Sequence, residues 1–396
     1  MIRAGKALTA ALTEEALRLF FPLGAVYAAL WPFAWTWVFQ LDLPLIQATP
    51  PSVWHGHEMI YGAYGAALLG FILTAVPEWT DTPRPAPRLL LVLACLWGIG
   101  RMVGLFGVDW ANALAGLADM AWLVALIGFV GRVAWRARTA SLNGFLLWLA
   151  ALLGCEAVLR WAIGAQDVAL AQTALRIAVL SFSALLALAL ARITPPITNR
   201  ILDPERKTAP FRPHPGKRHL APALIAVCIG AELAGASSAV LGYLSIAAGA
   251  AFMDRVAESF IGRQFFRLEI LALSGAAALA GLGLLLWGAG RLGAPGLDVV
   301  GLHVLGMGGL GVGVLGVFSI AGKLHTGQEL GLSKRIALAF ALLLLAVVLR
   351  AAPTFGVLPP GPMHGLASLA WAAAFLIWLR AYWPAFSAQP AGEARP

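Results

Sequence analysis

The sequence predicts an all-α polytopic membrane protein with twelve transmembrane helices and both termini in the cytoplasm. Of its 396 residues, 60% are hydrophobic and 12% are charged, and the mean hydropathy is +0.82. A water-soluble domain needs a polar exterior that this composition does not supply. Apolar windows of transmembrane length recur along the chain, and lysine and arginine gather on one set of connections. These three observations together give the fold class.

Twelve windows of about 20 apolar residues match the length needed to cross a hydrocarbon core about 30 Å thick. They fall at 17–38, 54–77, 89–107, 110–134, 144–163, 170–194, 220–235, 238–255, 268–289, 299–321, 336–352 and 362–384. The seventh and eighth belong to one apolar run from Leu220 to Met253, interrupted only at 235–238. That run is either two short helices in a hairpin or one tilted helix, and the charge pattern decides between them.

Lysine and arginine mark the cytoplasmic side of a membrane protein. With twelve spans, 19 of the 28 basic residues fall in the two termini and in the connections after even-numbered spans, whereas only Arg291 falls after an odd-numbered span. A single crossing at 220–253 would destroy this division. We therefore predict a hairpin there and both termini inside.

The net charge of +9 is accordingly a topology signal. Basic residues scattered over loops do not form the folded basic face of a nucleic-acid-binding protein, so no DNA or RNA partner is expected. The longest loop, 195–219, is rich in proline and basic residues. It predicts a cytoplasmic linker between a six-helix half at 1–194 and a second at 220–396, within one integral membrane domain.

The second span, WHGHEMIYGAYGAALLGFILTAVP, opens with His55, His57 and Glu58. Ionisable side chains are costly in a bilayer, so these residues indicate a functional site, and neutral imidazole is a common metal ligand. Two residues along an α-helix are about 200° apart, so we expect the two rings to serve different partners. The preceding proline pair predicts a helix start with Ser52 as its N-cap.

Further ionisable side chains are predicted in the outer half of the membrane. They are Arg101, Asp119, Glu156, Arg160, Arg176 and Glu232, with His303 at the outer end of the tenth span and His364 in the loop before the twelfth. Glu156 and Arg160 are four residues apart, so we expect an ion pair on one helix face. Pairing inside a bundle explains any one of these charges, but arginines and histidines at one depth also form a site for an anionic group that carries a metal. Haem, with two propionates and an axial histidine, fits that description. It selects as cofactor-binding residues His55, His57, His303, Arg101, Arg160 and Arg176.

The tenth span carries seven glycines within 301–316. Glycine in a membrane helix lets a flat ligand or a second helix come close, and a helix seam through Gly309 and Gly313 accounts for them equally well. His303 and Met307 are one turn apart, within reach of one metal.

His325, in the sequence KLHTGQEL, lies 22 residues after His303. That separation is about 33 Å along a helix, roughly the whole bilayer, so the two histidines cannot share a metal. We expect His325 at a cytoplasmic helix end turned by Gly327, where it is a separate candidate metal ligand.

Several of these motifs together carry a family resemblance. The stretches WHGHEMIYGAYGAALLGFILTAVPEWT, LWGIGRM, ARITPPITNRIL and SIAGKLHTGQEL resemble the NnrS family, twelve-span bacterial membrane proteins described as containing haem and copper and linked to nitric oxide. The resemblance covers nearly the whole chain. Its most specific parts are the HxHE opening followed by GFxLTAVPxWT, and the HTG after the tenth span. Family members often have GHTG where this chain has Leu324 before His325.

The resemblance implies a multi-pass protein of the bacterial inner membrane that binds haem b, with copper as a further metal. It also implies protection against nitric oxide and nitrosative stress, usually in connection with denitrification. The expected partners are nitric oxide and membrane lipid, with an electron donor that the sequence does not identify. The resemblance does not say which histidine binds haem and which binds copper. The residues that it selects are His55, His57, Glu58, Pro77, Trp79, Arg101, Arg192, His303, His325, Thr326 and Gly327.

Two functional classes fit this sequence. A haem protein would bind nitric oxide or, as an oxidoreductase similar to nitric oxide reductase, turn it over with electrons and protons from elsewhere. The alternative is a secondary transporter, since six plus six helices around a basic central loop is a common transporter plan. Transporter sites favour the middle of the bilayer, whereas these charges are predicted near its outer face. Only the haem protein predicts a Soret band.

Overall fold

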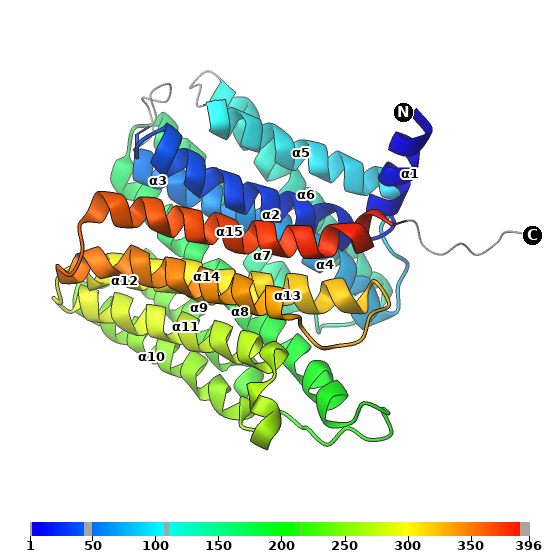
Figure 1. Cartoon of the computed structure of the whole chain (residues 1–396). Helices are drawn as coiled ribbons and strands as arrows, with labels where there is room; N and C mark the ends of the chain where they lie inside the picture. The colour runs from blue at the N-terminus through cyan, green and yellow to red at the C-terminus, as the bar shows by residue number, and fades with distance from the viewer. Residues whose placement is uncertain (1, 43–49, 107–110, 215, 389–396) are drawn as a thin grey trace, which may run out of the picture. The chain divides into compact units, whose positions relative to one another are not determined.

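The computed structural model describes residues 2–42, 50–106, 111–214 and 216–388, and the regular structure in these residues is helical throughout (Figure 1). Ten of the described helical segments are long and apolar enough to cross a membrane. They are Ala16–Val38, Pro51–Thr80, Asn112–Arg136, Asn143–Gly164, Val168–Leu202, Ser238–Ser259, Leu268–Arg291, Leu297–Leu324, Lys334–Phe355 and Pro360–Ser387. The prediction of an all-helical, multi-pass membrane protein is confirmed.

Two further helices, α5 (Pro87–Phe106) and α9 (Lys217–Leu233), occupy the positions of the third and seventh predicted spans. The predicted span ends at 107 and 110 lie outside the described residues, as does Arg395 of the charge pattern. The count of twelve crossings and the cytoplasmic placement of both termini stay predictions.

The apolar run at 220–253 forms two helices. After α9 the chain turns at Gly235, whose φ of +70° is one that glycine adopts without strain. Helix α10 (Ser238–Val256) then begins, capped by the hydroxyl of Ser237, which accepts a hydrogen bond from the Val240 N–H at 3.4 Å. Because α9 and α10 pack against each other, the predicted hairpin is confirmed.

Helix α8 (Val168–Leu202) runs further than the sequence indicated. It continues through Pro195 and Pro196 into the segment predicted as linker. Each proline removes one backbone donor, but this loss does not stop a long helix whose end is held by other contacts. The Asn199 side chain accepts a hydrogen bond from the Phe211 N–H at 2.7 Å and donates one to its carbonyl at 3.1 Å.

Contacts divide the chain into two compact units. The first comprises Met1–Ala178, Ala321–Gln328 and Phe375–Pro396, and the second comprises Val179–Ile320 and Glu329–Ala374. The boundary after the first segment of this unit therefore lies inside α8. The unit also includes two short segments from the second half of the sequence.

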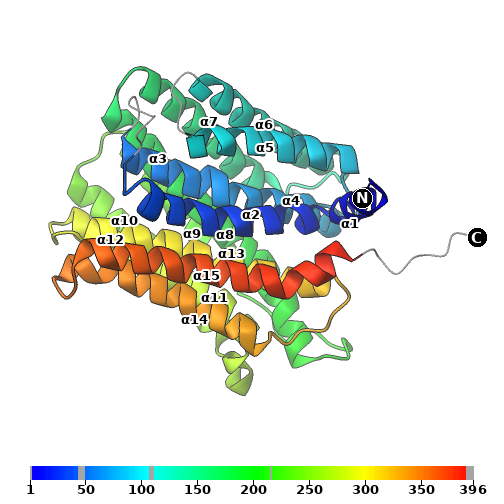
Figure 2. The same cartoon turned by 45° about the horizontal axis from the view of Figure 1, so that its top comes forward.

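In the first unit, five helices form the frame of the site. Helix α2 (Ala16–Phe33) packs against α4 (Gly65–Thr80), while α6 (Asn112–Arg136) packs against α4, α5 and α7 (Asn143–Gly164) (Figure 2). Large aromatic side chains, including Trp31 and Trp122, are fully buried between these helices. Other helices of the chain are α1 (Ile2–Leu12), α3 (Pro51–His57), α13 (Gly311–Leu324), α14 (Lys334–Ala351) and α15 (Pro360–Ser387).

In the second unit, glycines of the tenth span let two helices approach closely. Helix α12 (Leu297–His303) and the π-helix η6 (Val304–Leu310) both pack against α11 (Leu268–Arg291). A Cβ on Gly309 would lie only 2.8 Å from the Cα of Ala280 on α11. The glycine-lined helix seam that the sequence allowed is thus present at this position.

The charge pattern makes a test of topology possible. A reporter fused after Pro213 is expected to behave as cytoplasmic, and one inserted near Pro360 as periplasmic, because lysine and arginine are retained on the cytoplasmic side. Alkaline phosphatase and green fluorescent protein fusions at the two positions measure this directly. The opposite result at either position would contradict the count of twelve spans.

Candidate functional site

The helix that carries His57 changes its winding directly after that residue. Helix α3 begins with Pro51 at its first position and Pro50 as its N-cap, so the prediction that Ser52 is the cap is wrong. Proline is well suited to the first helical position, that of Pro51, because a backbone N–H there would have no partner within the helix. At Glu58 the α-helix gives way to the π-helix η2 (Glu58–Tyr64). π-helical turns are rare and concentrate at functional sites.

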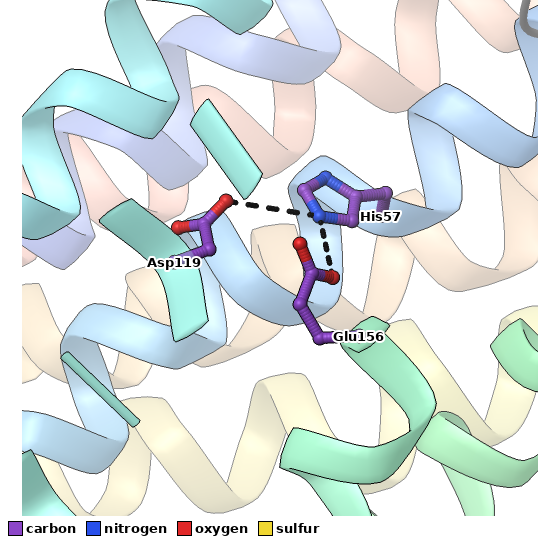
Figure 3. Close-up of side chains that lie close together, drawn as sticks. All are labelled: His57, Asp119 and Glu156. Atoms are coloured by element: carbon purple, nitrogen blue, oxygen red, sulfur yellow. Dashed lines mark hydrogen bonds and ion pairs between the residues drawn. The ribbon is translucent and has the colours of Figure 1, made fainter. Parts of the chain in front are cut away.

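The His57 ring is completely buried and lies between carboxylates on three helices. Its Nδ1 is 2.8 Å from Glu58 Oε1, and its Nε2 is 3.0 Å from Glu156 Oε2 and 3.9 Å from Asp119 Oδ2 (Figure 3). Above and below, the ring stacks on Trp54 and Tyr61, each with a centroid distance of 5.0 Å. These contacts fix the ring in both tilt and rotation.

Two arginines, Arg101 and Arg160, complete an ion-pair network around His57. Arg101 Nε lies 2.9 Å from Glu58 Oε2, and its Nη2 donates to Asp119 Oδ2 at 2.8 Å. Arg160 Nε donates to Glu156 Oε1 at 2.6 Å, and its Nη2 donates to the same Asp119 oxygen at 3.0 Å. The predicted pair of Glu156 and Arg160 is confirmed as one part of this larger network.

Neutral donors and acceptors occupy the rest of the network. The Tyr27 hydroxyl donates to Glu58, Trp122 Nε1 donates to Asp119 Oδ1 at 3.0 Å, and Arg160 Nη1 donates to Asn112 Oδ1. Sequence reasoning missed all three residues, because a tyrosine, a tryptophan and an asparagine in apolar helices carry no signal that they face a charge.

The charges of the network leave one positive charge to be supplied. Glu58, Asp119 and Glu156 carry three negative charges against the two of Arg101 and Arg160. A proton on the His57 ring brings the sum to zero, whereas a divalent ion beside a neutral ring brings it to plus one. One ligand atom from each of His57, Asp119 and Glu156 lies within 4.8 Å of the others, so the group could hold a metal ion. Such an ion would have to compete with both guanidiniums for the same oxygens.

The neighbouring His55 has different partners. Its ring stacks on Trp35 at a centroid distance of 5.1 Å and on Trp31 at 6.5 Å, with interplanar angles of 17° and 22°. The two histidines of the HxHE motif therefore face different surroundings, as their separation of two helical residues predicts. His55 is half-buried, whereas His57 is fully enclosed.

His303 belongs to the second unit and ends helix α12 just before the π-helix η6. Its Nδ1 donates to the Val299 carbonyl, one turn earlier, at 2.8 Å. That bond places the proton on Nδ1 and the lone pair on Nε2, the arrangement common among metal-ligating histidines. One turn later, a Cβ on Gly306 would meet no atom within 4 Å. His303 could therefore ligate a metal, and Gly306 leaves space on the following turn.

His325 lies at the end of α13 in a separate polar cluster of the first unit. Its Nδ1 is 3.1 Å from Glu15 Oε2, and its Nε2 is 3.5 Å from Glu78 Oε1. Arg84 Nη2 lies 2.6 Å from the other oxygen of Glu15. The chain turns two residues later at Gly327, with φ at +71°, so the predicted turn is confirmed. In this structure His325 pairs with two carboxylates.

The remaining predicted residues lie elsewhere. Arg176 Nη2 donates to Thr173 Oγ1, one turn earlier on α8, at 2.8 Å. His364 was expected in a loop, but α15 begins at Pro360, so it lies in a helix and accepts a hydrogen bond from Arg350 Nη1 at 3.0 Å. The proline at position 360 starts that helix, which is why PGPMH does not form a loop.

The structure thus brings together some of the predicted site residues. His57, Arg101 and Arg160 share one network in the first unit, with His55 two residues away from it. His325 is in the second cluster of that unit, and His303 is part of the other unit.

Comparison with known proteins gives one family match. The model of the NnrS family, described as NnrS protein, matches residues 11–389, nearly the whole chain. Comparison with curated proteins gives no match.

The network predicts a strong dependence of stability on Arg101. Replacing it with glutamine leaves Glu58 and Asp119 buried without their shared cation, which is expected to cost about 3–5 kcal/mol. Thermal unfolding in detergent, followed by size-exclusion chromatography, measures the loss. The double variant R101Q/E58Q removes one charge of each sign and should recover part of it. Arg132→Gln, an exposed arginine on α6, is the matched control, and equal effects of R101Q and R132Q would contradict the role of the network.

The cluster at His325 predicts an acid-sensitive contribution to stability. Burial alone would raise the pKa of Glu15, but the hydrogen bond from His325 and the charge of Arg84 hold it below the ordinary value. A depressed folded pKa stabilises the protein above the unfolded pKa, about 4.3 for glutamate, and this stabilisation is lost as the pH falls through the folded pKa.

We therefore expect Glu15→Gln to lower the melting temperature at pH 7 by about 1–3 °C. The variant should also lose less stability than the wild type when the pH falls from 5 to 3. Melting curves over this range test both statements. Glu14→Gln, which removes the neighbouring carboxylate paired with Arg18, is the control, and an identical acid response in E15Q and wild type would rule the contribution out.

Proposed function

Since the chain belongs to the NnrS family, which is linked to nitric oxide responses, we propose that it binds haem b, with copper as a further metal, and binds or turns over nitric oxide. In this role the protein lies in the bacterial inner membrane and protects the cell against nitrosative stress. The family match carries the proposal, and the geometry around His303 supports the haem. A haem would supply the iron at which nitric oxide binds.

His303 is the residue that we propose would hold the haem iron. Its Nδ1–H is held by the Val299 carbonyl, so Nε2 is the nitrogen that would ligate the metal. The open space at Gly306 lies on the following turn, where a planar group can approach the helix.

His57 is given a different role. Both of its ring nitrogens lie within hydrogen-bond distance of carboxylates, and its two faces are covered by Trp54 and Tyr61. A ring enclosed in this way holds Glu58 and Glu156 in place and keeps water away from the space between the helices. His55, half-buried beside Trp31 and Trp35, is the histidine of the pair that we propose for the copper.

Nitric oxide reaches such a protein without a polar channel, because it is small, neutral and soluble in lipid. The buried carboxylates and arginines therefore need not form a path for it. Reduction of nitric oxide would require electrons from a donor outside this chain, whereas binding alone would not.

An optical spectrum of the detergent-purified protein is the first test. A Soret band that shifts on addition of nitric oxide is expected, and a protein with no haem after expression in haem-replete cells would overturn the proposal in favour of the transporter.

Three histidine variants then assign the roles. His303→Ala is expected to lose the haem spectrum because it loses the ligand, and His55→Ala is expected to keep haem and lose copper. His57→Ala is expected to lower the melting temperature, because it leaves the network with an uncompensated charge. Haem quantification, metal analysis and melting curves measure these outcomes. Wild-type haem content in His303→Ala would contradict its assignment to haem, and wild-type copper content in His55→Ala would contradict the assignment of copper.

A further inference from the structure

Arg350, near the end of α14, differs from the arginines of the network. Its side chain is half-buried in a helix apolar enough to cross a membrane. Its Nη1 donates to His364 Nε2 at 3.0 Å, and among the described residues no carboxylate contributes to its electrostatic surroundings. Arg101 and Arg160, by contrast, are each bound to two carboxylates.

The partner of Arg350 cannot neutralise it. His364 accepts a hydrogen bond from the guanidinium through Nε2, so that nitrogen carries no proton and the ring, protonated on Nδ1 alone, is neutral. The contact orients the guanidinium but leaves its positive charge uncompensated. A charge in an apolar helix without a counter-charge is costly, so it is retained where it binds something anionic.

Arg350 lies at the same end of the second unit as His303. A Cβ on Gly296, just before α12, would collide with the Thr354 methyl group, so these two residues are level with each other. His303 is seven residues beyond Gly296, about 10 Å along the helix, and Arg350 is four residues before Thr354, about 6 Å. Because α14 also packs against α12 and η6, the guanidinium and the His303 ring lie at similar depths on neighbouring helices.

We propose that Arg350, positioned by His364, binds one anionic oxygen group, a carboxylate or a phosphate. Guanidinium presents a planar fork of donors that matches either group, and such charge-assisted pairs are about twice as strong as neutral hydrogen bonds. If the group is a carboxylate, it belongs to a haem propionate, and the inference then rests on the proposed function. If the group is a phosphate, it belongs to an anionic lipid headgroup, and no haem is needed.

The test compares Arg350→Gln with Arg335→Gln in the full chain. Arg335 is an exposed arginine at the opposite end of the same helix, so the control makes the same substitution away from the site. Protein produced under haem limitation is titrated with haem and with haem dimethyl ester, whose propionates carry no charge. In a second arm, native mass spectrometry counts phosphatidylglycerol and phosphatidylcholine retained by each protein from mixed micelles.

If the group is a propionate, the wild type and R335Q bind haem about tenfold more tightly than its dimethyl ester, and R350Q loses most of this difference. If the group is a lipid phosphate, R350Q loses the preference for phosphatidylglycerol and its haem affinities match those of the wild type. R350Q that equals R335Q in both arms overturns the site. Failure of the wild type to bind any haem refutes the proposed function alone, because the lipid arm still reports on Arg350.

Two further variants guard against loss of folding. Arg350→Lys keeps the charge without the planar fork, and His364→Gln keeps the arginine without its positioning imidazole. Both are expected to show a reduced preference in the arm that R350Q affects. Melting curves and size-exclusion profiles confirm that each is folded, and wild-type preference in both variants would contradict the positioning by His364.

Discussion

The first unit depends on the pairing of three buried carboxylates with buried Arg101, largely buried Arg160 and one histidine. Each of these charges alone would destabilise the apolar space between the helices, since removing an ion from water costs several kcal/mol even after relaxation. Asp119 makes the arrangement possible, because a single oxygen receives both Arg101 and Arg160. The helices α3 with η2, α5, α6 and α7 are therefore joined by one electrostatic unit, and none of its members can be removed singly without leaving a charge exposed to the core.

This closed network changes what the conspicuous residues can do. Arginines in a membrane helix suggest an anion-binding site, and the sequence predicts Arg101 and Arg160 as cofactor-binding residues on that basis. Their donors are already directed to Glu58, Asp119 and Glu156, so an added anion would displace internal carboxylates. An arginine of the second unit, Arg350, has no such partner in the described chain. The capacity to bind an anion thus follows from the absence of a counter-charge, which a sequence does not display.

The sequence was sufficient where the physics is local. Transmembrane windows follow from length and hydropathy, the hairpin at 220–253 from a charge count, the pair of Glu156 and Arg160 from helical spacing, and the different surroundings of His55 and His57 from the rotation between them. Long-range partners were not predictable. Nothing in the apolar run around Tyr27 shows that its hydroxyl meets Glu58, because that contact depends on how α2 packs against η2. The end of α8 was also missed, since the bonds from Asn199 to Phe211 that hold it involve a residue of the following loop.

Two of the three π-helices in the described residues, η2 and η6, give the clearest case of a feature that the sequence hides. His57 is followed directly by η2, and His303 is followed directly by η6. A π-helix bonds each residue to the fifth along rather than the fourth, so each turn holds about one residue more than in an α-helix. The residues after the π-helix therefore lie at a different angle about the helix axis, relative to the preceding histidine, than they would on a regular α-helix. A histidine can then point toward polar partners while the apolar face that follows stays against the neighbouring helices. In both units the change in winding lets the histidine, His57 or His303, take an orientation different from the one that a regular α-helix in the same span would give it.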